Sequence, residues 1–388
     1  MKRVTVKGKK WYYFHPWIYA KSLVDDGEAS PGECVEVYTT RGQFLGSAFF
    51  NPHSKIVLRF YSREKREFDY HFVRNKLERA LEWRRSLYPG ENSFRVLFGE
   101  SDGVPGLVVD KYGDGLVIQV LSYGVERHKK DVIYALQDLF SPSFIFEKGD
   151  SSLRAEEGLP LADRLHHGEI PESLEIEVSG LKYLVDIAGG QKTGFYFDQR
   201  ENRERVVSLV KGTKALDIFS YTGGFTLHLL KAGFSRVYAV DRSKSALSLL
   251  MKNVELNSFE RERVVPIEKE AFQFLDEMLL SGMKFDVIVL DPPSFARKKG
   301  QVEEAINGFK VLHDRAIRLL EPGGYIVTFS CSHYISGEAL LESFTVPAMN
   351  LRRHFVLLER LGQAKDHPVL LGFRESEYLK GFVLKETT

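Results

Sequence analysis

Cysteine and long apolar segments are scarce in this chain. Its 388 residues include only two cysteines, Cys34 and Cys331. Because they lie in segments that we expect to form separate domains, the sequence predicts no disulfide framework and favours a reducing compartment, the cytoplasm. The N-terminal residues carry no continuous apolar stretch, and no later run reaches membrane-spanning length. The composition therefore argues against disulfide-rich secreted proteins and membrane-spanning proteins.

An excess of charge of one sign is also absent. Lysine and arginine (54) nearly balance aspartate and glutamate (53), which gives a net charge of +1. Any nucleic-acid contact must therefore come from local basic patches rather than from a global field. The length predicts two or three domains.

The chain divides into three stretches by pattern. Residues 1–69 read as short strands separated by turn residues, which predicts a small β-barrel-like module. Within it, residues 7–17 mix cations and aromatics, a pattern that suits both RNA contact and an aromatic mini-core with a basic edge. Residues 70–175 predict a compact α+β domain with a basic-faced helix, a hairpin, a helix near 126–139 and a strand near 143–147. We find no catalytic constellation there.

Residues 176–388 alternate strands with helices, which predicts βαβ units and a parallel sheet. The fold class is therefore α/β, with a doubly wound sheet in the last stretch. Gly323 and Gly324 predict a helix stop before the fifth strand. The expected strands are 215–219, 236–240, 264–267, 285–290 and 325–330, and the expected helices lie near 224–232, 243–257, 271–280, 303–320 and 337–344.

One end of this sheet has the pattern of a nucleoside site. The first strand leads into the small-residue turn 220–225 and then a helix, whose free N–H groups suit an anionic group. Asp241 ends the next strand, 24 residues after Asp217 (241 − 217), about where doubly wound folds hold a ribose. The turn has too few glycines for a nicotinamide dinucleotide but enough for S-adenosylmethionine, although packing alone would also explain them.

Two later strands end in reactive side chains. Asp291-Pro292-Pro293 follows an apolar strand, and its carbonyl groups are free to accept hydrogen bonds from the amino group of a base. Cys331 follows the next strand, at the edge where open α/β sheets bind ligands. Since buried cysteine is more often inert, the prediction requires Asp291 and Cys331 to share one cleft.

A thiol and a carboxyl group facing one pyrimidine suit covalent catalysis. Carbon 5 of cytosine is a poor nucleophile until a thiolate adds to carbon 6, and Asp291 can protonate or hydrogen-bond ring nitrogen 3. We expect nearby donors or His333 to favour the thiolate of Cys331. The predicted catalytic pair is Cys331 and Asp291, whereas Cys34 is predicted to be structural.

With these residues identified, the chain resembles the bacterial ribosomal large-subunit RNA cytosine-5 methyltransferase I family over essentially its whole length. The resemblance implies S-adenosylmethionine as cofactor and formation of 5-methylcytidine in 23S ribosomal RNA by a homodimer. It implies a PUA-like RNA-binding domain (1–69), a central α+β domain (70–175) and a Rossmann-like class I methyltransferase domain (176–388), with no metal. Its motifs are 190–202, 216–225, 291–295 and 329–332.

The resemblance also implies individual roles. Asp241 would bind the ribose, Glu270 and Ala271 would lie near adenine, and Ser294 stands where many related enzymes have a second cysteine. Glu270 departs from the aspartate that relatives commonly have there. The other expected cofactor-binding residues are Gln199, Arg200, Asp217, Ser220, Tyr221, Thr222, Gly223 and Asp291, and the expected substrate-binding residues are Pro292, Pro293, Ser294, Arg297 and Lys298.

Two alternatives remain. Related guanine methyltransferases share the cofactor motifs and an Asp-Pro-Pro loop but lack the thiol, because the base attacks the methyl group directly. Cys331 therefore favours carbon methylation over methylation of guanine or an exocyclic amine. The other alternative is a non-catalytic RNA-binding factor.

Overall fold

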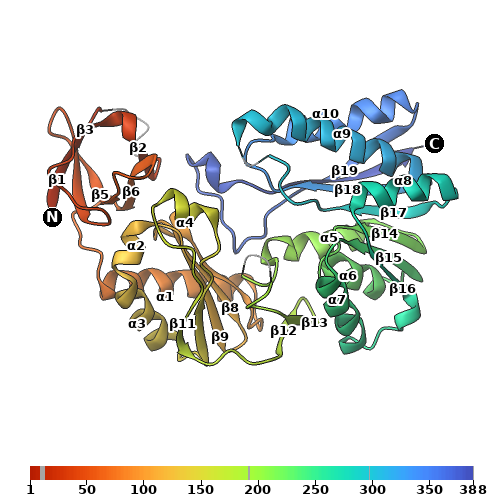
Figure 1. Ribbon diagram of the computed structural model, residues 1–388, viewed down its shortest axis with the longest axis horizontal. Helices are drawn as coiled ribbons and strands as arrows, with labels where there is room; N and C mark the ends of the chain where they lie inside the picture. Colours follow the sequence, from red (N-terminus) through yellow and green to blue (C-terminus); the bar gives the residue numbers. More distant parts are fainter. Residues whose placement is uncertain (9–13, 191–192, 297, 388) are drawn as a thin grey trace. The chain divides into compact units, whose positions relative to one another are not determined.

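The computed structural model describes residues 1–8, 14–190, 193–296 and 298–387 (Figure 1). The chain forms two compact units, and both are discontinuous in sequence. Unit 1 comprises Met1–Val178, Val185–Asp198 and Lys365–Ser376, and unit 2 comprises Ser179–Leu184, Gln199–Ala364 and Glu377–Thr388. Within the described ranges, no helix is long and apolar enough to cross a membrane.

Unit 1 begins with a six-stranded sheet in the order β2-β6-β5-β4-β1-β3. Buried and partly exposed residues alternate along β4, so that Val35 and Val37 join Val4, Val6 and Leu58 in a small apolar core. The strands are β1 (Lys2–Val6), β2 (Trp17–Tyr19), β3 (Leu23–Asp25), β4 (Cys34–Thr39), β5 (Phe44–Phe50) and β6 (Ile56–Ser62).

The second part of unit 1 is a five-stranded sheet, β11-β10-β9-β8-β7, with helices packed on it. Asp69 caps the first helix by accepting a hydrogen bond from the backbone N–H of Phe72 at 2.8 Å. The predicted helix near 126–139 is two helices that meet at His128. The elements are α1 (Tyr70–Leu87), β7 (Phe94–Phe98), β8 (Leu107–Tyr112), β9 (Gly115–Val120), α2 (Tyr123–Arg127), α3 (Lys129–Phe140), β10 (Phe144–Glu147), α4 (Ser152–Glu156) and β11 (Arg164–Gly168).

The chain passes from unit 1 to unit 2 near a separate two-stranded sheet, β12 (Leu174–Val178) and β13 (Leu181–Val185). Residues 185–198 and 365–376 cluster with unit 1, although they follow Val178 in the sequence. Buried polar contacts hold both segments. Thr193 donates to Asp110 at 2.5 Å, and Asp366 accepts from the backbone N–H of Arg95 at 3.0 Å.

Unit 2 contains a seven-stranded sheet in the order β16-β15-β14-β17-β18-β20-β19. The first five strands are parallel, and β20 and β19 complete the sheet as antiparallel strands. The strands are β14 (Lys214–Ile218), β15 (Arg236–Asp241), β16 (Val264–Glu268), β17 (Phe285–Leu290), β18 (Leu320–Ser330), β19 (His354–Gly362) and β20 (Lys380–Thr387).

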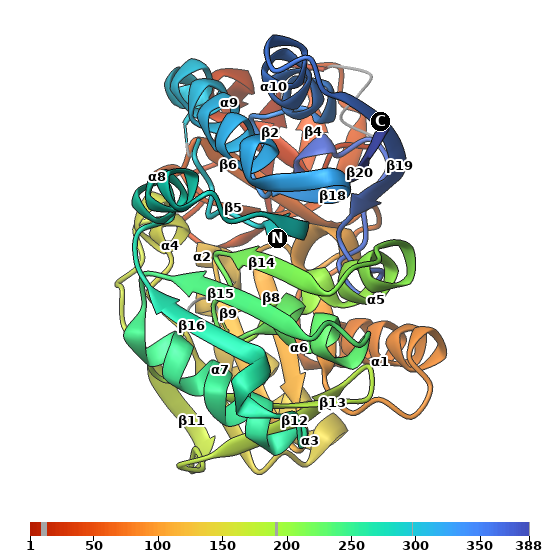
Figure 2. The same cartoon turned by 90° about the vertical axis from the view of Figure 1, so that its right-hand side faces the viewer.

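Helices cover both faces of this sheet. Helices α5, α6 and α7 lie along one face, and helices α8, α9 and α10 lie along the other (Figure 2). This is the doubly wound α/β arrangement that the alternating pattern predicts, and the prediction of fold class is confirmed. The helices are α5 (Arg200–Leu209), α6 (Gly224–Lys231), α7 (Lys244–Leu256), α8 (Ala271–Ser281), α9 (Val302–Leu319) and α10 (Gly337–Asn350).

Most predicted elements of unit 2 match the structure, with differences near its C-terminal end. The helix α10 continues six residues beyond its expected end at 344. The predicted helix stop at Gly323 and Gly324 is wrong, because α9 ends at Leu319 and both glycines lie inside β18. A Cβ atom at Gly324 would lie 2.8 Å from the carbonyl oxygen of Asp286, so close strand approach explains that glycine.

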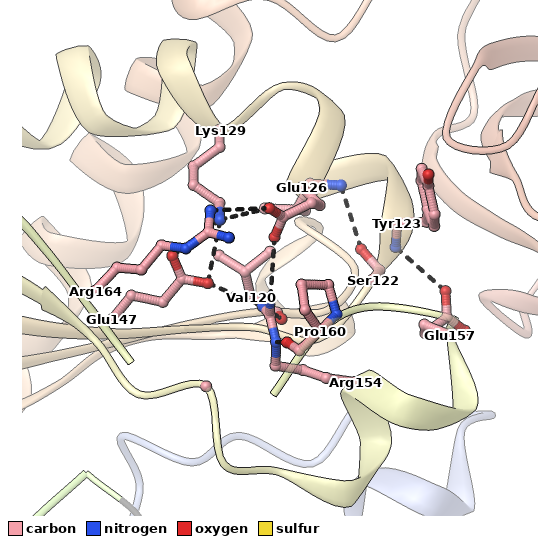
Figure 3. Close-up of polar contacts among 12 residues, drawn as sticks. Val120, Ser122, Tyr123, Glu126, Lys129, Glu147, Arg154, Glu157, Pro160 and Arg164 are labelled. Atoms are coloured by element: carbon pink, nitrogen blue, oxygen red, sulfur yellow. Dashed lines mark hydrogen bonds and ion pairs between the residues drawn. The ribbon is translucent and has the colours of Figure 1, made fainter. Parts of the chain in front are cut away.

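A buried ionic network organises the second sheet of unit 1 (Figure 3). Arg154 is fully buried and donates to the carbonyl groups of Val120 (2.6 Å) and Pro160 (2.9 Å) and to Glu147 (2.9 Å). Burial alone would raise the pKa of Glu147, but hydrogen bonds from His166 and Lys129, with the charges of Lys129 and Arg154, hold it below its usual value. Glu147 therefore stabilises the fold when ionised, and this stability is lost as the pH falls.

We expect Arg154→Met to lower the free energy of unfolding by about 3 kcal/mol at pH 7, because it leaves Glu147 buried with fewer partners. The loss should shrink as Glu147 is protonated below about pH 4.5. Urea unfolding at pH 7 and at a pH below about 4.5 measures the loss of unfolding free energy. The control is Arg164→Met, which removes a 46% exposed side chain beside Glu126 and should cost less than about 1 kcal/mol. Equal losses of unfolding free energy in Arg154→Met and Arg164→Met would contradict a stabilising role for the buried Arg154–Glu147 pair.

Candidate active site

Three neighbouring parallel strands end at one edge of the sheet in unit 2. Ile218 of β14 pairs with Leu290 of β17, which pairs with Thr328 of β18. Asp291 directly follows β17, and its backbone N–H lies 3.5 Å from the carbonyl oxygen of Ile218. The register therefore brings Asp217, Asp291 and Cys331 to the same edge, where open α/β sheets bind ligands.

The loop after β17 and the loop after β18 contact each other. The Sγ atom of Cys331 lies 3.9 Å from the carbonyl oxygen of Pro292. The hydroxyl groups of Ser294 and Ser332 both donate to the carbonyl of Ala296, at 3.0 and 2.8 Å. Cys331 is partly exposed rather than sealed in the core. The thiol is thus held beside the Asp-Pro-Pro loop and open to approach.

A hydrogen-bonded chain of side chains fixes Asp291. The side-chain amide of Gln199 donates to its carboxylate at 3.0 Å. Asn202 in turn donates to Gln199 at 2.6 Å and to the carbonyl of Gly362 at 2.8 Å. Gln199 and Arg200 are both 2% exposed at the start of α5. Sequence reasoning named these two residues and missed Asn202, whose position three residues after Gln199, one helical turn on, was the available signal.

The turn after β14 is a strained loop tied to β15. The backbone φ angle is positive at Phe219 (+68°), Tyr221 (+48°) and Gly223 (+91°). Asp241 accepts hydrogen bonds from the backbone N–H groups of Tyr221 (3.0 Å) and Ser243 (2.8 Å). Asn253 donates to the carbonyl of Thr222 at 3.1 Å. These contacts hold the loop in a shape that its residues rarely adopt alone.

The glycines of this turn are needed for packing. A Cβ atom at Gly223 would lie 2.8 Å from Cγ of Leu250, and one at Gly224 would lie 2.6 Å from Nε of Arg203. The Ser220 hydroxyl, in contrast, suits contact with a ligand. It is 95% buried (5% exposed), and its hydroxyl has no hydrogen-bond partner among the described residues. A buried hydroxyl left unpaired costs about 1–3 kcal/mol, so it suits a polar group of a bound cofactor.

The other expected site residues differ in exposure. Glu270 caps α8, accepting from the backbone N–H groups of Phe272 (2.8 Å) and Gln273 (3.1 Å), and Ala271 is buried behind it. In the Asp-Pro-Pro loop Pro292 is buried, whereas Pro293 and Lys298 are exposed. Arg297 lies outside the described residues.

Comparisons with known proteins identify the families to which this chain is similar. The model of the S-adenosylmethionine-dependent methyltransferase family matches residues 160–372, and a PUA-like domain model matches residues 6–63. Ribosomal RNA large subunit methyltransferase I of Vibrio cholerae is 39% identical over 377 residues, which cover 96% of this chain and 95% of the relative. The protein of that name from Cronobacter sakazakii is 38% identical over 373 residues, 95% of this chain and 94% of the relative.

This chain belongs to the ribosomal RNA large subunit methyltransferase I family. The predicted resemblance is thereby confirmed, and S-adenosylmethionine is the cofactor of this methyltransferase. Among solved structures, a Streptococcus mutans protein assigned as a SAM-dependent methyltransferase aligns with a TM-score of 0.85 at 19% identity, covering 99% of this chain and all of that one. SMU.776 complexed with SAH aligns with a TM-score of 0.84 at 20% identity, with the same coverage. These similarities show the shared fold.

Asp217 is a strongly perturbed acid at this edge of the sheet. It is 1% exposed, and Thr226 donates to it at 2.6 Å. Burial raises the pKa of Asp217 to about 7; the Thr226 hydrogen bond opposes this shift, and the nearby charge of Asp291 adds to it. A cation at this edge would favour the ionised form, so Asp217 and Ser220 fit the ammonium and carboxylate ends of S-adenosylmethionine.

Lys380 is a further residue at this edge that sequence reasoning missed. It begins β20, and its Nζ atom donates to the carbonyl of Ser332, next to Cys331, at 3.1 Å. The sequence carried no signal for it, because β20 joins the sheet as an antiparallel strand outside the alternating pattern.

We expect Asp217→Asn to stabilise the methyltransferase at pH 8 but not at pH 4. The folded state holds the Asp217 proton up to about pH 7, so the stability of the wild type falls as the pH rises from about 4 to about 7. Asparagine removes this cost, which amounts to about 2–4 kcal/mol. Urea unfolding across this pH range measures the difference.

Asp286→Asn is the control of opposite sign. Burial raises the pKa of Asp286, but hydrogen bonds from the backbone of Lys214 and Thr213 outweigh it and lower the pKa overall. That carboxylate stabilises the fold above its unfolded pKa, so its removal should destabilise the protein at pH 8. If Asp217→Asn raised the free energy of unfolding equally at every pH, the raised pKa of Asp217 would be contradicted.

Proposed function

We propose that this methyltransferase forms 5-methylcytidine in 23S ribosomal RNA through a covalent adduct between Cys331 and the base. The observation that carries the proposal is the approach of Cys331 Sγ to within 3.9 Å of the Pro292 carbonyl, beside Asp291 at one sheet edge. The ribosomal RNA substrate follows from the names of relatives that match almost the whole chain. Action on ribosomal RNA also favours a cytoplasmic location.

The chain supplies a nucleophile and an acid. In the proposed reaction the Cys331 thiolate adds to carbon 6 of cytosine, while Asp291 protonates ring nitrogen 3, so that electron density moves to carbon 5. S-adenosylmethionine, when bound, would supply an electrophilic methyl group, and carbon 5 would bond to it as the methyl–sulfonium bond breaks. Loss of the carbon 5 proton to a base then restores the carbon 5–carbon 6 double bond, the bond to sulfur breaks and Asp291 regains its proton. Gln199, which donates to Asp291, orients this carboxyl group.

The remaining expected roles are part of the proposal. Ser220 to Gly223, with Asp217, would hold the methionine end of the cofactor, Asp241 the ribose, and Glu270 with Ala271 the adenine. Gln199 and Arg200 would border the cofactor. Pro292, Pro293 and Ser294 would hold the base, which must be unpaired or flipped to enter the site. The exposed Lys298 and the neighbouring Arg297 would hold the RNA backbone.

RNA containing 5-fluorocytidine tests the covalent step. Fluorine at carbon 5 blocks the last proton removal, so we expect a protein–RNA adduct that survives denaturing electrophoresis with the wild type and disappears in Cys331→Ala. Asp291→Asn should lower adduct formation by at least about 100-fold, within the range for loss of a general acid.

Cys34→Ala is the matched control, because Cys34 is the other thiol and is 7% exposed. It should form the adduct at the wild-type rate. If Cys331→Ala still methylates RNA, the guanine or exocyclic-amine alternative replaces the proposal. If the protein binds RNA but not S-adenosylmethionine, the non-catalytic alternative replaces it.

We also propose a homodimer and the three-domain division at residues 69/70 and 175/176. An observation that favours self-association is the edge strand β19, on which Val356, Leu357 and Leu358 are 43%, 38% and 40% exposed. Exposed apolar edge strands are normally protected, and a second copy would cover this one.

Sedimentation velocity tests the dimer. We expect the wild type to sediment with twice its 44.4 kDa mass, and the double variant Val356→Lys with Leu358→Lys to sediment as a monomer. The control is Leu280→Lys, which changes another exposed leucine (90% exposed) and should leave the mass unchanged. A monomeric wild type at micromolar concentration would contradict the homodimer.

A further inference from the structure

We propose that Lys380 is a positioning residue that holds Cys331 in its thiolate form. The inference rests on the proposed function, in which Cys331 is the nucleophile, and it adds the group that activates this thiol. The sequence analysis expected nearby donors or His333 to activate the thiol. The contacts around Cys331 favour the lysine.

Strand pairing brings Lys380 to the cysteine loop. The strand β20 runs antiparallel to β18, and Lys380 pairs with Ser330, the residue immediately before Cys331. Lys380 is the first residue of β20 and Ser330 the last of β18. The lysine is therefore fixed by the sheet itself, at the point where the reactive loop leaves β18.

Backbone carbonyl groups hold the ammonium group in place. Its Nζ atom donates to the carbonyl of Ser332 at 3.1 Å and to those of Glu377 and Tyr378 at 3.4 Å each. Three acceptors match the three donors of an ammonium group. Because these acceptors are neutral, the positive charge stays available to a neighbouring thiolate.

The electrostatics of the pair agree with this placement. Burial lowers the pKa of Lys380, and the negative charges of Glu377 and Cys331 oppose this shift. Since charge interactions are reciprocal, the ammonium group that the thiolate stabilises also stabilises the thiolate. A cationic neighbour is a usual means by which proteins make a cysteine reactive near neutral pH.

Other ionisable groups near Cys331 also affect the thiolate, some by stabilising it and some by destabilising it. Asp291 and Glu377 disfavour a thiolate when ionised. His333 is exposed, and its ring is tilted against the Tyr378 ring, with centroids 5.8 Å apart, so solvent screens its charge more strongly than that of half-buried Lys380. Lys380 is thus the cation whose position the sheet fixes.

The test is the pH dependence of iodoacetamide alkylation at Cys331 in the full-length protein, followed by mass spectrometry of its peptide. We expect Lys380→Met to raise the midpoint pH of alkylation by about one unit, the size of shift that one nearby charge produces. Lys380→Arg keeps the charge and should restore the midpoint to within about 0.3 units of the wild type. The control Lys385→Met removes a lysine from the same strand and should shift nothing.

Catalysis provides a second measurement. At pH 7, Lys380→Met should lower kcat about tenfold with little change in KM, and activity should recover as the pH rises by one unit. A purely structural role would not give this recovery. If Lys380→Met unfolds, Lys380→Gln replaces it, and the wild-type midpoint should also rise between 0.05 and 1 M salt as the charge is screened.

An unchanged midpoint in folded Lys380→Met, or an equal shift in Lys380→Arg, would overturn the inference. Its failure is distinguishable from failure of the proposed function. If the wild type forms the fluorocytidine adduct but Lys380→Met alkylates like the wild type, only the role of Lys380 falls. If the wild type forms no adduct but the midpoint shifts, the lysine–thiol pair stands and the covalent mechanism falls.

Discussion

The parallel register of β14, β17 and β18 is the constraint on which the site depends. In parallel pairing the carboxyl ends of adjacent strands fall at the same edge, so Asp217, Asp291 and Cys331 meet although 114 positions separate the first from the last (331 − 217). The loops that follow then fix the side chains. Ser294 and Ser332 share the Ala296 carbonyl, and Gln199 holds Asp291. Strand register and side-chain hydrogen bonds together thus place the candidate site residues.

The same edge is where the fold tolerates unfavourable local structure. Phe219 and Tyr221 have positive φ angles, Ser220 buries an unpaired hydroxyl among the described residues, and burial raises the pKa of Asp217 to about 7. Each feature costs stability in the protein without cofactor, and each would be relieved or used when a charged ligand binds. These features cluster at the end of β14 and in the turn that follows it.

Unit 1 shows a second use of buried polar groups. Arg95 forms a bidentate ion pair with Asp110, with both hydrogen bonds at 2.8 Å, and the backbone N–H of Arg95 donates to Asp366. Arg84 pairs with Asp102 at 2.7 Å and donates to the Asp366 carbonyl. These contacts fasten residues 365–376, which lie between β19 and β20 in the sequence, into unit 1. The chain immediately beyond this segment begins β20 and carries Lys380.

The parallel strands, the helices between them and the Asp-Pro-Pro and cysteine loops could be predicted from the residues, because apolar periodicity and proline act through local geometry. The strand β17 was predicted at its observed bounds. Tertiary structure alone decided the rest. The antiparallel strands β19 and β20, the position of Lys380 and the return of residues 365–376 to unit 1 depend on pairing between distant segments. Such pairing is set by backbone hydrogen bonding and burial, which leave no periodic pattern in the residues themselves.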